Sequence, residues 1–165
     1  FWEDIRILMK IFLFKVLVKS PSSAELKEIL NRTTGSHSVD LMPLLPPNET
    51  SETIMNMRVL ARKVLVAPPL EDLLIGSMFA LTPGTPSCTE SVAEYVRFGP
   101  GPRAAQSVLL AAKVLALLDG RLNLAYEDIK TVMIPALRHR LILNFQAEAE
   151  GVTADQIIKE VQETA

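Results

Sequence analysis

One stretch constrains the fold of this chain more than any other: the run from Pro102 to Leu118, P-R-A-A-Q-S-V-L-L-A-A-K-V-L-A-L-L. Pro102 suits the first position of a helix, where a missing N–H costs nothing. Asp119-Gly120 then ends the run. From Val108 onward the helix is apolar almost all the way round, and such a helix is normally central and covered on most sides. The run therefore predicts a helical fold built around this segment.

Composition agrees with that prediction and limits the class of function. The chain has 165 residues, 48% of them hydrophobic and only 5% aromatic, so the core is expected to come from aliphatic side chains and Met. A net charge of −2 gives no electrostatic footprint for nonspecific nucleic-acid binding. The single Cys88 excludes an intrachain disulfide and favours a reducing cytoplasm. No apolar run reaches the ~18–20 residues of a membrane span, so no membrane insertion is expected.

The N-terminal part predicts a strand. Phe12 to Val18, F-L-F-K-V-L-V, is rich in large and β-branched apolar residues and is bounded by Ser20-Pro21. A lone strand cannot satisfy its edges, so its partners are expected outside this sequence or in another chain. We expect this orphan strand to be disordered, misplaced or paired with another copy.

Helical signals dominate the remaining chain. Capping boxes at Ser22–Glu25 and Thr153–Gln156 predict one helix to about Thr33 and a terminal helix. Apolar periodicity predicts further helices over about 51–64, 69–81, 90–95 and 102–118, and one from 126 that Pro135 kinks or ends. Residues 36–50 hold three prolines and predict an irregular connector. The expected fold class is mainly α: a bundle of about five to seven helices preceded by one orphan β-strand.

Several catalytic motifs are absent from the sequence. It contains no G-x-x-x-x-G-K-[ST], so the phosphate loop of a P-loop hydrolase is missing, and no G-x-S-x-G. One Cys and two distant His, His37 and His139, form no metal-ligand cluster, and no metal site is expected. The chain is therefore not expected to catalyse a reaction alone.

Arg103 is the residue that most needs an explanation. It follows G-P-G-P in the first helical turn, where the helix dipole disfavours a cation by about 0.3–1 kcal/mol. It is either a surface arginine whose head reaches water, the commoner case, or part of an anion site. In the second case Gly101, Pro102 and Ala104 form a supporting helix N-terminus, whose N–H groups other than at Pro102 and whose dipole attract an anion, and the guanidinium binds phosphate bidentately.

Arg138-His139-Arg140 is a second candidate group. The favoured interpretation is that these basic residues complement the dipole at a helix C-terminus. A contact with a neighbouring domain is the other.

Taken together, these residues resemble a known family. Y-V-R-F-G-P-G-P-R-A-A-Q-S-V-L-L-A-A-K-V-L-A-L-L-D-G-R resembles the C-terminal lid of MoxR-type AAA+ ATPases, which typically show Y-V-R-Y-G-A-S-P-R-A before a helix ending in G-R. The similarity continues through Y-E-D-I and P-A-L-R-H-R-L-I-L-N to A-E-A-E-G-V-T. Upstream, F-L-F-K-V-L-V-K-S-P-S is similar to the last core strand and its exit. The resemblance covers about residues 12–160.

The resemblance implies a division of the chain and a role for Arg103. Residues 1–20 would end the AAA+ core, and residues 21–165 would be the helical lid with its connector at 36–50. Arg103 matches the sensor-2 arginine, which reaches the terminal phosphates of ATP bound with Mg²⁺ to the same subunit. Family members are hexameric ring ATPases. They resemble chaperones for cofactor insertion and complex maturation, often with partners that carry von Willebrand A domains.

The sequence departs from the family pattern in two places. The family usually has D-R-F before L-x-K, with an arginine that acts on the neighbouring subunit's ATP, whereas here Ile11 holds that position in Lys10-Ile11-Phe12. Either the arginine finger is lost, or the first ten or so residues do not follow the family. The usual S-P-R reads Gly101-Pro102-Arg103, which removes a hydroxyl cap and keeps the arginine.

The leading hypothesis is a nucleotide-sensing lid from a MoxR-like ATPase. The alternative is a non-enzymatic helical protein-interaction module that has lost its ATPase core, as the missing finger and the unmatched N-terminus suggest. DNA binding through a helix-turn-helix is a weaker third, because the chain is acidic overall and lacks a basic recognition helix.

Overall fold

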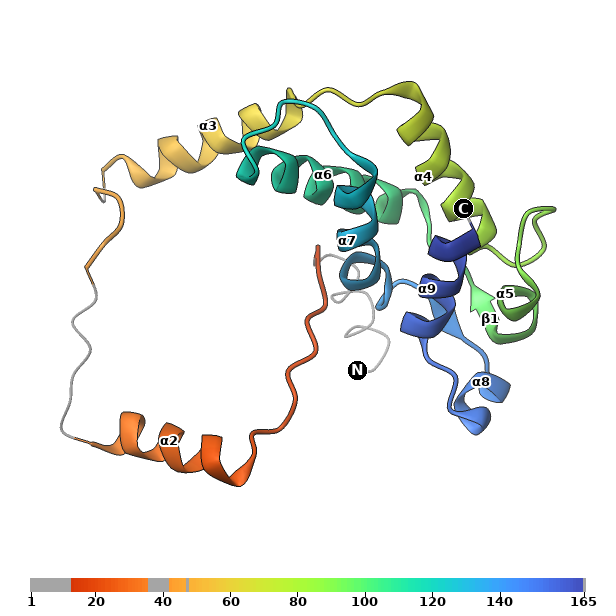
Figure 1. Cartoon of the computed structure of the whole chain (residues 1–165), viewed down its shortest axis with the longest axis horizontal. Coiled ribbons are helices and arrows are strands. Elements are labelled where there is room, and N and C mark those ends of the chain that lie inside the picture. Colours follow the sequence, from red (N-terminus) through yellow and green to blue (C-terminus); the bar gives the residue numbers. More distant parts are fainter. Residues whose placement is uncertain (1–12, 36–41, 47, 165) are drawn as a thin grey trace. The chain divides into compact units, whose positions relative to one another are not determined.

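The computed structural model describes residues 13–35, 42–46 and 48–164 of the chain (Figure 1). These residues fall into two compact units. The larger unit comprises residues 13–15 and 58–164, and the smaller comprises residues 16–57. The expected domain boundary at residue 20 stays a prediction.

The described residues are mainly helical, as the sequence predicts. They form eight helices and one small antiparallel sheet: α2 (Ser23–Thr34), α3 (Thr50–Arg62), α4 (Pro68–Ala80), α5 (Glu90–Tyr95), β1 (Val96–Phe98), α6 (Pro102–Leu118), α7 (Tyr126–Leu137), β2 (Ile142–Leu143), α8 (Phe145–Glu150) and α9 (Ala154–Thr164). The helix that sequence analysis missed is α8, in a polar stretch. Its N-terminus is capped by the Asn144 side chain, and Gly151 ends it at a positive φ of 71°.

The segment expected as an orphan strand has no sheet partner among the described residues. Residues 14–22 carry no regular secondary structure, and Phe12 lies outside the described residues. The N–H of Lys15 donates instead to the carbonyl of Pro135 in α7, at 2.9 Å. A strand without neighbours has no ladder to join, which is the physical reason for this conformation.

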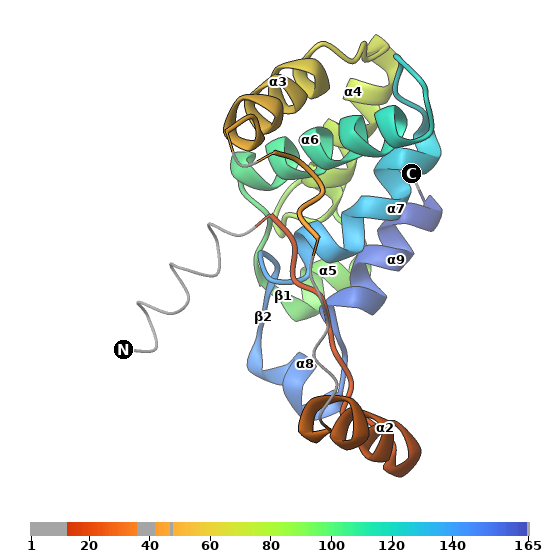
Figure 2. The same ribbon diagram turned by 90° about the vertical axis from the view of Figure 1, so that its left-hand side faces the viewer.

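The core of the larger unit forms where α6 and α7 pack together, with α9 against α7 and α4 against both α6 and α9 (Figures 1 and 2). The side chains that α6 buries in this core are small: Ala104, Ser107, Val108, Ala111, Ala112 and Ala116. Such side chains let a neighbouring helix approach closely. The prediction that α6 is covered on most sides is only partly right, because Val114 is 45% and Leu118 76% exposed.

Asp128 and Pro135 mark the two ends of α7. The Asp128 carboxylate accepts from the Ala125 N–H at 2.8 Å and from both terminal nitrogens of Arg121, at 2.8 and 2.7 Å. It therefore caps the helix start and pairs with Arg121 at once. Pro135 lies inside the last turn, two residues before the helix ends at Leu137, as expected for a residue without an N–H.

The two short strands form a connection that sequence analysis did not predict. β1 pairs antiparallel with β2, Val96 opposite Leu143 and Phe98 opposite Ile142. This pairing holds the chain that leaves α7 beside the loop that enters α6.

The smaller unit has no buried helix face. The N-terminus of α2 carries the predicted capping box, with the Ser22 N–H donating to Glu25 at 2.7 Å. The expected apolar face of Leu26, Ile29 and Leu30 is exposed, since no described element of this unit covers it. Of the expected connector over 36–50, residues 36–41 and 47 lie outside the described residues.

Candidate functional site

The loop before α6 is fixed by close packing at Gly99. A Cβ at this position would lie 2.6 Å from Thr82 Oγ1, 2.7 Å from Thr82 Cα and 2.8 Å from the Leu81 carbonyl oxygen. Leu81 is fully buried at the end of α4, so these backbone atoms have little freedom to move. Only glycine fits here, and its fit sets where the following G-P-R residues stand.

The N-terminus of α6 opens without a side-chain cap. Gly101 is the N-cap residue and Pro102 begins the helix, and the first turn holds no acidic side chain. Ala104 is buried, with its N–H donating to the Gly101 carbonyl at 2.8 Å. Arg103 is exposed, while its carbonyl accepts from Ser107 Oγ at 2.8 Å. The positive end of the dipole and the Arg103 guanidinium thus lie in the same turn.

Arg103 lines a cavity of about 740 Å³. Its walls come from β1, the 99–101 loop, the start of α6 and the chain leading into β2: Phe98, Gly99, Gly101, Pro102, Arg103, Ala104, Arg140 and Ile142. Among these described residues, two side chains are charged, and both are arginines: Arg103 and Arg140. The cavity therefore suits an anionic group.

Arg140 is the buried partner in this cavity. Its residue is only 9% exposed. Burial lowers the pKa of Arg140, and the positive charge of Arg103 lowers it further. Both effects disfavour the charged guanidinium, so an anion placed between the two arginines would stabilise it.

The basic triplet that the sequence grouped together is divided by the structure. Arg138 pairs with Asp155 of α9 through two hydrogen bonds, at 3.0 and 2.8 Å, and its Nη1 donates to the Lys15 carbonyl at 3.3 Å. His139 is half-buried beside it. All three follow the end of α7, as the dipole interpretation requires. Of the triplet, Arg140 lines the cavity.

Residues 89–161 match the AAA lid domain family. The chain is 30% identical over 157 residues to the chaperone MoxR1 of Mycobacterium tuberculosis, a match that covers 93% of this chain and 39% of that protein. The chain carries an AAA lid domain of the MoxR type. The matched residues contain both arginines of the cavity, so the cavity belongs to the lid domain.

Two further relatives support the assignment of the lid. The uncharacterized protein YeaC of Bacillus subtilis is 26% identical over 150 residues, covering 91% of this chain and 43% of that protein. A solved structure from Cytophaga hutchinsonii, described as a candidate ATPase, superposes with a TM-score of 0.82 at 28% identity, over 97% of this chain and 48% of that one. The chain thus spans about two fifths of the length of the curated relatives that it matches.

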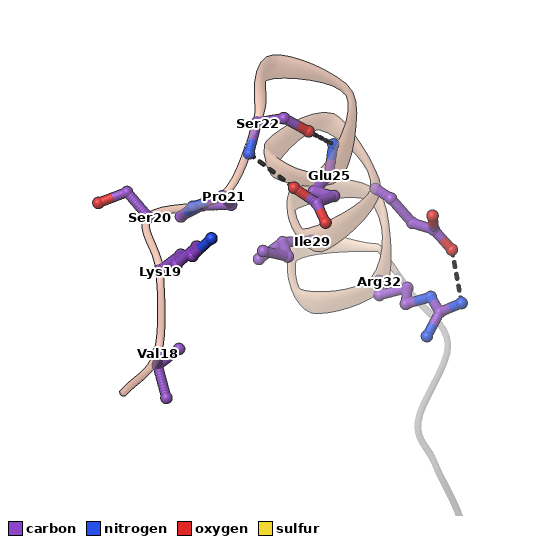
Figure 3. Close-up of a pocket in the computed structure, with 9 residues that line it drawn as sticks. Val18, Lys19, Ser20, Pro21, Ser22, Glu25, Ile29 and Arg32 are labelled. Atoms are coloured by element: carbon purple, nitrogen blue, oxygen red, sulfur yellow. Dashed lines mark hydrogen bonds and ion pairs between the residues drawn. The ribbon is translucent and has the colours of Figure 1, made fainter. Parts of the chain in front are cut away.

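A second cavity, of about 680 Å³, lies outside the lid match, between residues 18–22 and α2 (Figure 3). Every residue that lines it is exposed. Four of its polar residues already bond in pairs: Ser22 with Glu25 in the capping box, and Glu28 with Arg32 in an ion pair. We assign it no ligand.

The remaining sequence predictions have simpler outcomes. Ile11, at the position of the missing arginine finger, lies outside the described residues. Within the described ranges, no group of three or more His, Cys, Asp or Glu side chains is placed to hold a metal ion. In the same part of the chain, no helix combines the length and apolar character needed to cross a membrane.

Proposed function

We propose that this chain is the nucleotide-sensing lid of a MoxR-like AAA+ ATPase and that Arg103 is its sensor-2 arginine. The observation that carries this proposal is the placement of Arg103, in the uncapped first turn of α6 and on a cavity that a second arginine also lines. The AAA lid match over residues 89–161 supports it.

In this proposal the chain's own residues bind and sense the terminal phosphates of ATP. The Arg103 guanidinium donates two parallel hydrogen bonds to phosphate oxygens, and the positive end of the α6 dipole faces the same charge. Without an anion, the positive end of the α6 dipole disfavours the Arg103 charge. A bound anion attracts both the dipole end and the guanidinium, and this attraction outweighs the repulsion between them. ATP and its Mg²⁺ are held by an AAA+ core, whose P-loop motif this sequence does not contain.

The proposal extends to the assembly in which the lid works. We infer that the lid acts on its own AAA+ core, within a homo-oligomeric ring that is hexameric in this family. The name of the relative, chaperone MoxR1, supports a chaperone role. Maturation of complexes or insertion of cofactors is the form of that role that we propose. A protein with a von Willebrand A domain is the expected partner, and the cytoplasm is the expected compartment.

The test is Arg103→Ala in the full-length protein that carries this chain. A hydrogen bond to a charged group is worth about 1.5–3 kcal/mol, and each ~1.4 kcal/mol is about tenfold in rate, so ATP hydrolysis should fall by roughly 10- to 150-fold. Arg62→Ala, at an exposed arginine on α3 away from the cavity, should leave hydrolysis unchanged.

Circular dichroism should show the same helix content for both variants, because the Arg103 side chain is exposed. ATP hydrolysis at the wild-type rate by Arg103→Ala would contradict the assignment of Arg103 as the sensor-2 arginine. The 165-residue chain alone should not hydrolyse ATP, and saturable hydrolysis that Arg103→Ala abolishes would show that the site is complete without a core.

A further inference from the structure

We propose that Arg140 is a second phosphate-binding residue of the lid, which holds the terminal phosphate of the bound nucleotide together with Arg103. This inference rests on the proposed function, because it adds a residue to the same site. It assigns Arg140 a ligand, whereas the interpretation favoured from the sequence is that Arg140 complements the dipole at a helix C-terminus.

The backbone around Arg140 is held from two sides. The N–H groups of Arg140 and Leu141 both donate to the Leu137 carbonyl, at 2.8 and 3.0 Å, which makes a tight turn at the end of α7. Directly after it, Ile142 pairs with Phe98 of β1. Because Phe98 and Ile142 both line the cavity, this pairing fixes Arg140 at its wall.

The two arginines reach the cavity from different elements. Arg103 comes from the first turn of α6, and Arg140 comes from the chain between α7 and β2. Two guanidinium groups on one cavity suit a ligand with several charged oxygens, since each planar fork takes two of them. A terminal phosphate offers three oxygens and about two negative charges, more than one arginine satisfies.

Burial gives the same indication. Arg140 as a whole residue is 9% exposed, and its charge lies near that of Arg103, so a negative charge in the cavity would stabilise both guanidinium groups. A structural arginine at a helix C-terminus does not need to face a cavity beside a second arginine. The two arginines after α7 differ in position: Arg138 pairs with Asp155 of α9, whereas Arg140 lines the cavity.

The experiment compares two nucleotides that differ at the terminal phosphate. In the full-length protein, the affinities for the hydrolysis-resistant analogue AMP-PNP and for ADP are measured by calorimetry with Mg²⁺, for wild type and for Arg140→Met. The Met side chain keeps an unbranched apolar stem in the buried position. We expect AMP-PNP to bind about tenfold or more weakly, and ADP to bind within about twofold of wild type.

Two further variants serve as controls. Arg62→Met removes an exposed arginine of α3 that does not line the cavity, and it should change neither affinity. Arg140→Lys keeps the charge and loses the bidentate fork, so AMP-PNP affinity should fall between wild type and Arg140→Met. If Arg140→Met fails to fold, Arg140→Lys decides the question, because a purely structural role would leave its AMP-PNP affinity unchanged.

The outcomes separate this inference from the proposed function. A selective loss of AMP-PNP affinity in the Arg140 variants supports the inference. Wild-type AMP-PNP affinity, or an equal loss for ADP, overturns it. If Arg103→Ala loses AMP-PNP affinity and Arg140→Met does not, this inference alone fails. If neither variant loses it, the proposed function fails as well.

Discussion

Gly99 makes the sharpest prediction about how the lid holds its site. Gly99→Ala adds one methyl group that would lie 2.6–2.8 Å from atoms of Thr82 and Leu81. Carbon atoms in ordinary contact are about 3.5–4.0 Å apart, so the loop must move by roughly 1 Å. Two of the three close atoms are backbone, and no side-chain rotation relieves those contacts.

The magnitude follows from two opposing effects. Overpacking of a well-packed site costs about 1–3 kcal/mol, whereas replacing Gly by Ala stabilises by about 0.4–1 kcal/mol through the unfolded state. The net loss in the free energy of unfolding is about 1–2 kcal/mol. For a chain of this size that lowers Tm by about 2–8 °C. Because the same loop sets the position of Arg103, the proposed sensor role predicts that ATP hydrolysis by the full-length protein should fall too, since a shift of about 1 Å can cost up to 10²-fold in activity.

The matched control is Gly101→Ala, two residues further along the same loop. A Cβ there meets nothing within 4 Å, and its φ of −83° suits any residue. Alanine is a weaker N-cap than glycine, which offsets most of the gain from the unfolded state, so its stability should stay within about 0.5 kcal/mol of wild type. Thermal and urea unfolding followed by circular dichroism measure both variants. Equal stability of the two would refute the argument from close packing.

Two ion pairs give the remaining predictions. Asp128→Ala removes both the cap on α7 and the acceptor for Arg121, which is 32% exposed, and urea unfolding should show a loss of about 1–3 kcal/mol. Hydrogen bonds from Arg121 lower the pKa of Asp128, so the pair stabilises the fold above the ordinary value of about 3.9. That contribution disappears as pH falls through the lowered pKa, and the gap between wild type and Asp128→Ala should close there; a constant gap would contradict it. Arg138→Met breaks the pair with Asp155 and the bond to the Lys15 carbonyl, and hydrogen exchange should show faster exchange of the Lys15 amide. Unchanged protection would show that Arg138 does not hold this segment.

The helix ends were predictable wherever the signal is local. The helix over Pro102–Leu118 is observed with those bounds, because a proline at the first position and Asp119-Gly120 after the last act within one turn. The reciprocal bonds between Thr153 and Gln156 likewise confirm the second capping box, at 2.8 and 3.3 Å. Caps involve residues three apart, so the sequence contains their whole geometry.

The site was only half predictable for the opposite reason. Arg103 stands out because its charge conflicts with the helix start where it lies. Arg140 gives no such signal, since a basic residue just after α7 fits the dipole of that helix. Its place on the cavity depends on the pairing of Val96 with Leu143 and Phe98 with Ile142, more than 40 residues apart in sequence. Strands of three and two residues leave almost no periodic pattern to detect.

The turn that follows α7 connects the two halves of this argument. Arg138 holds the carbonyl of Lys15, and Arg140, two residues later, faces the cavity with Arg103. The Leu137 carbonyl accepts from both Arg140 and Leu141, so the turn is short and internally bonded. A stiff turn of this kind cannot move its cavity side alone. The turn therefore connects the cavity to the segment at residues 13–15, and the proposed coupling of the lid to a bound nucleotide would use this connection.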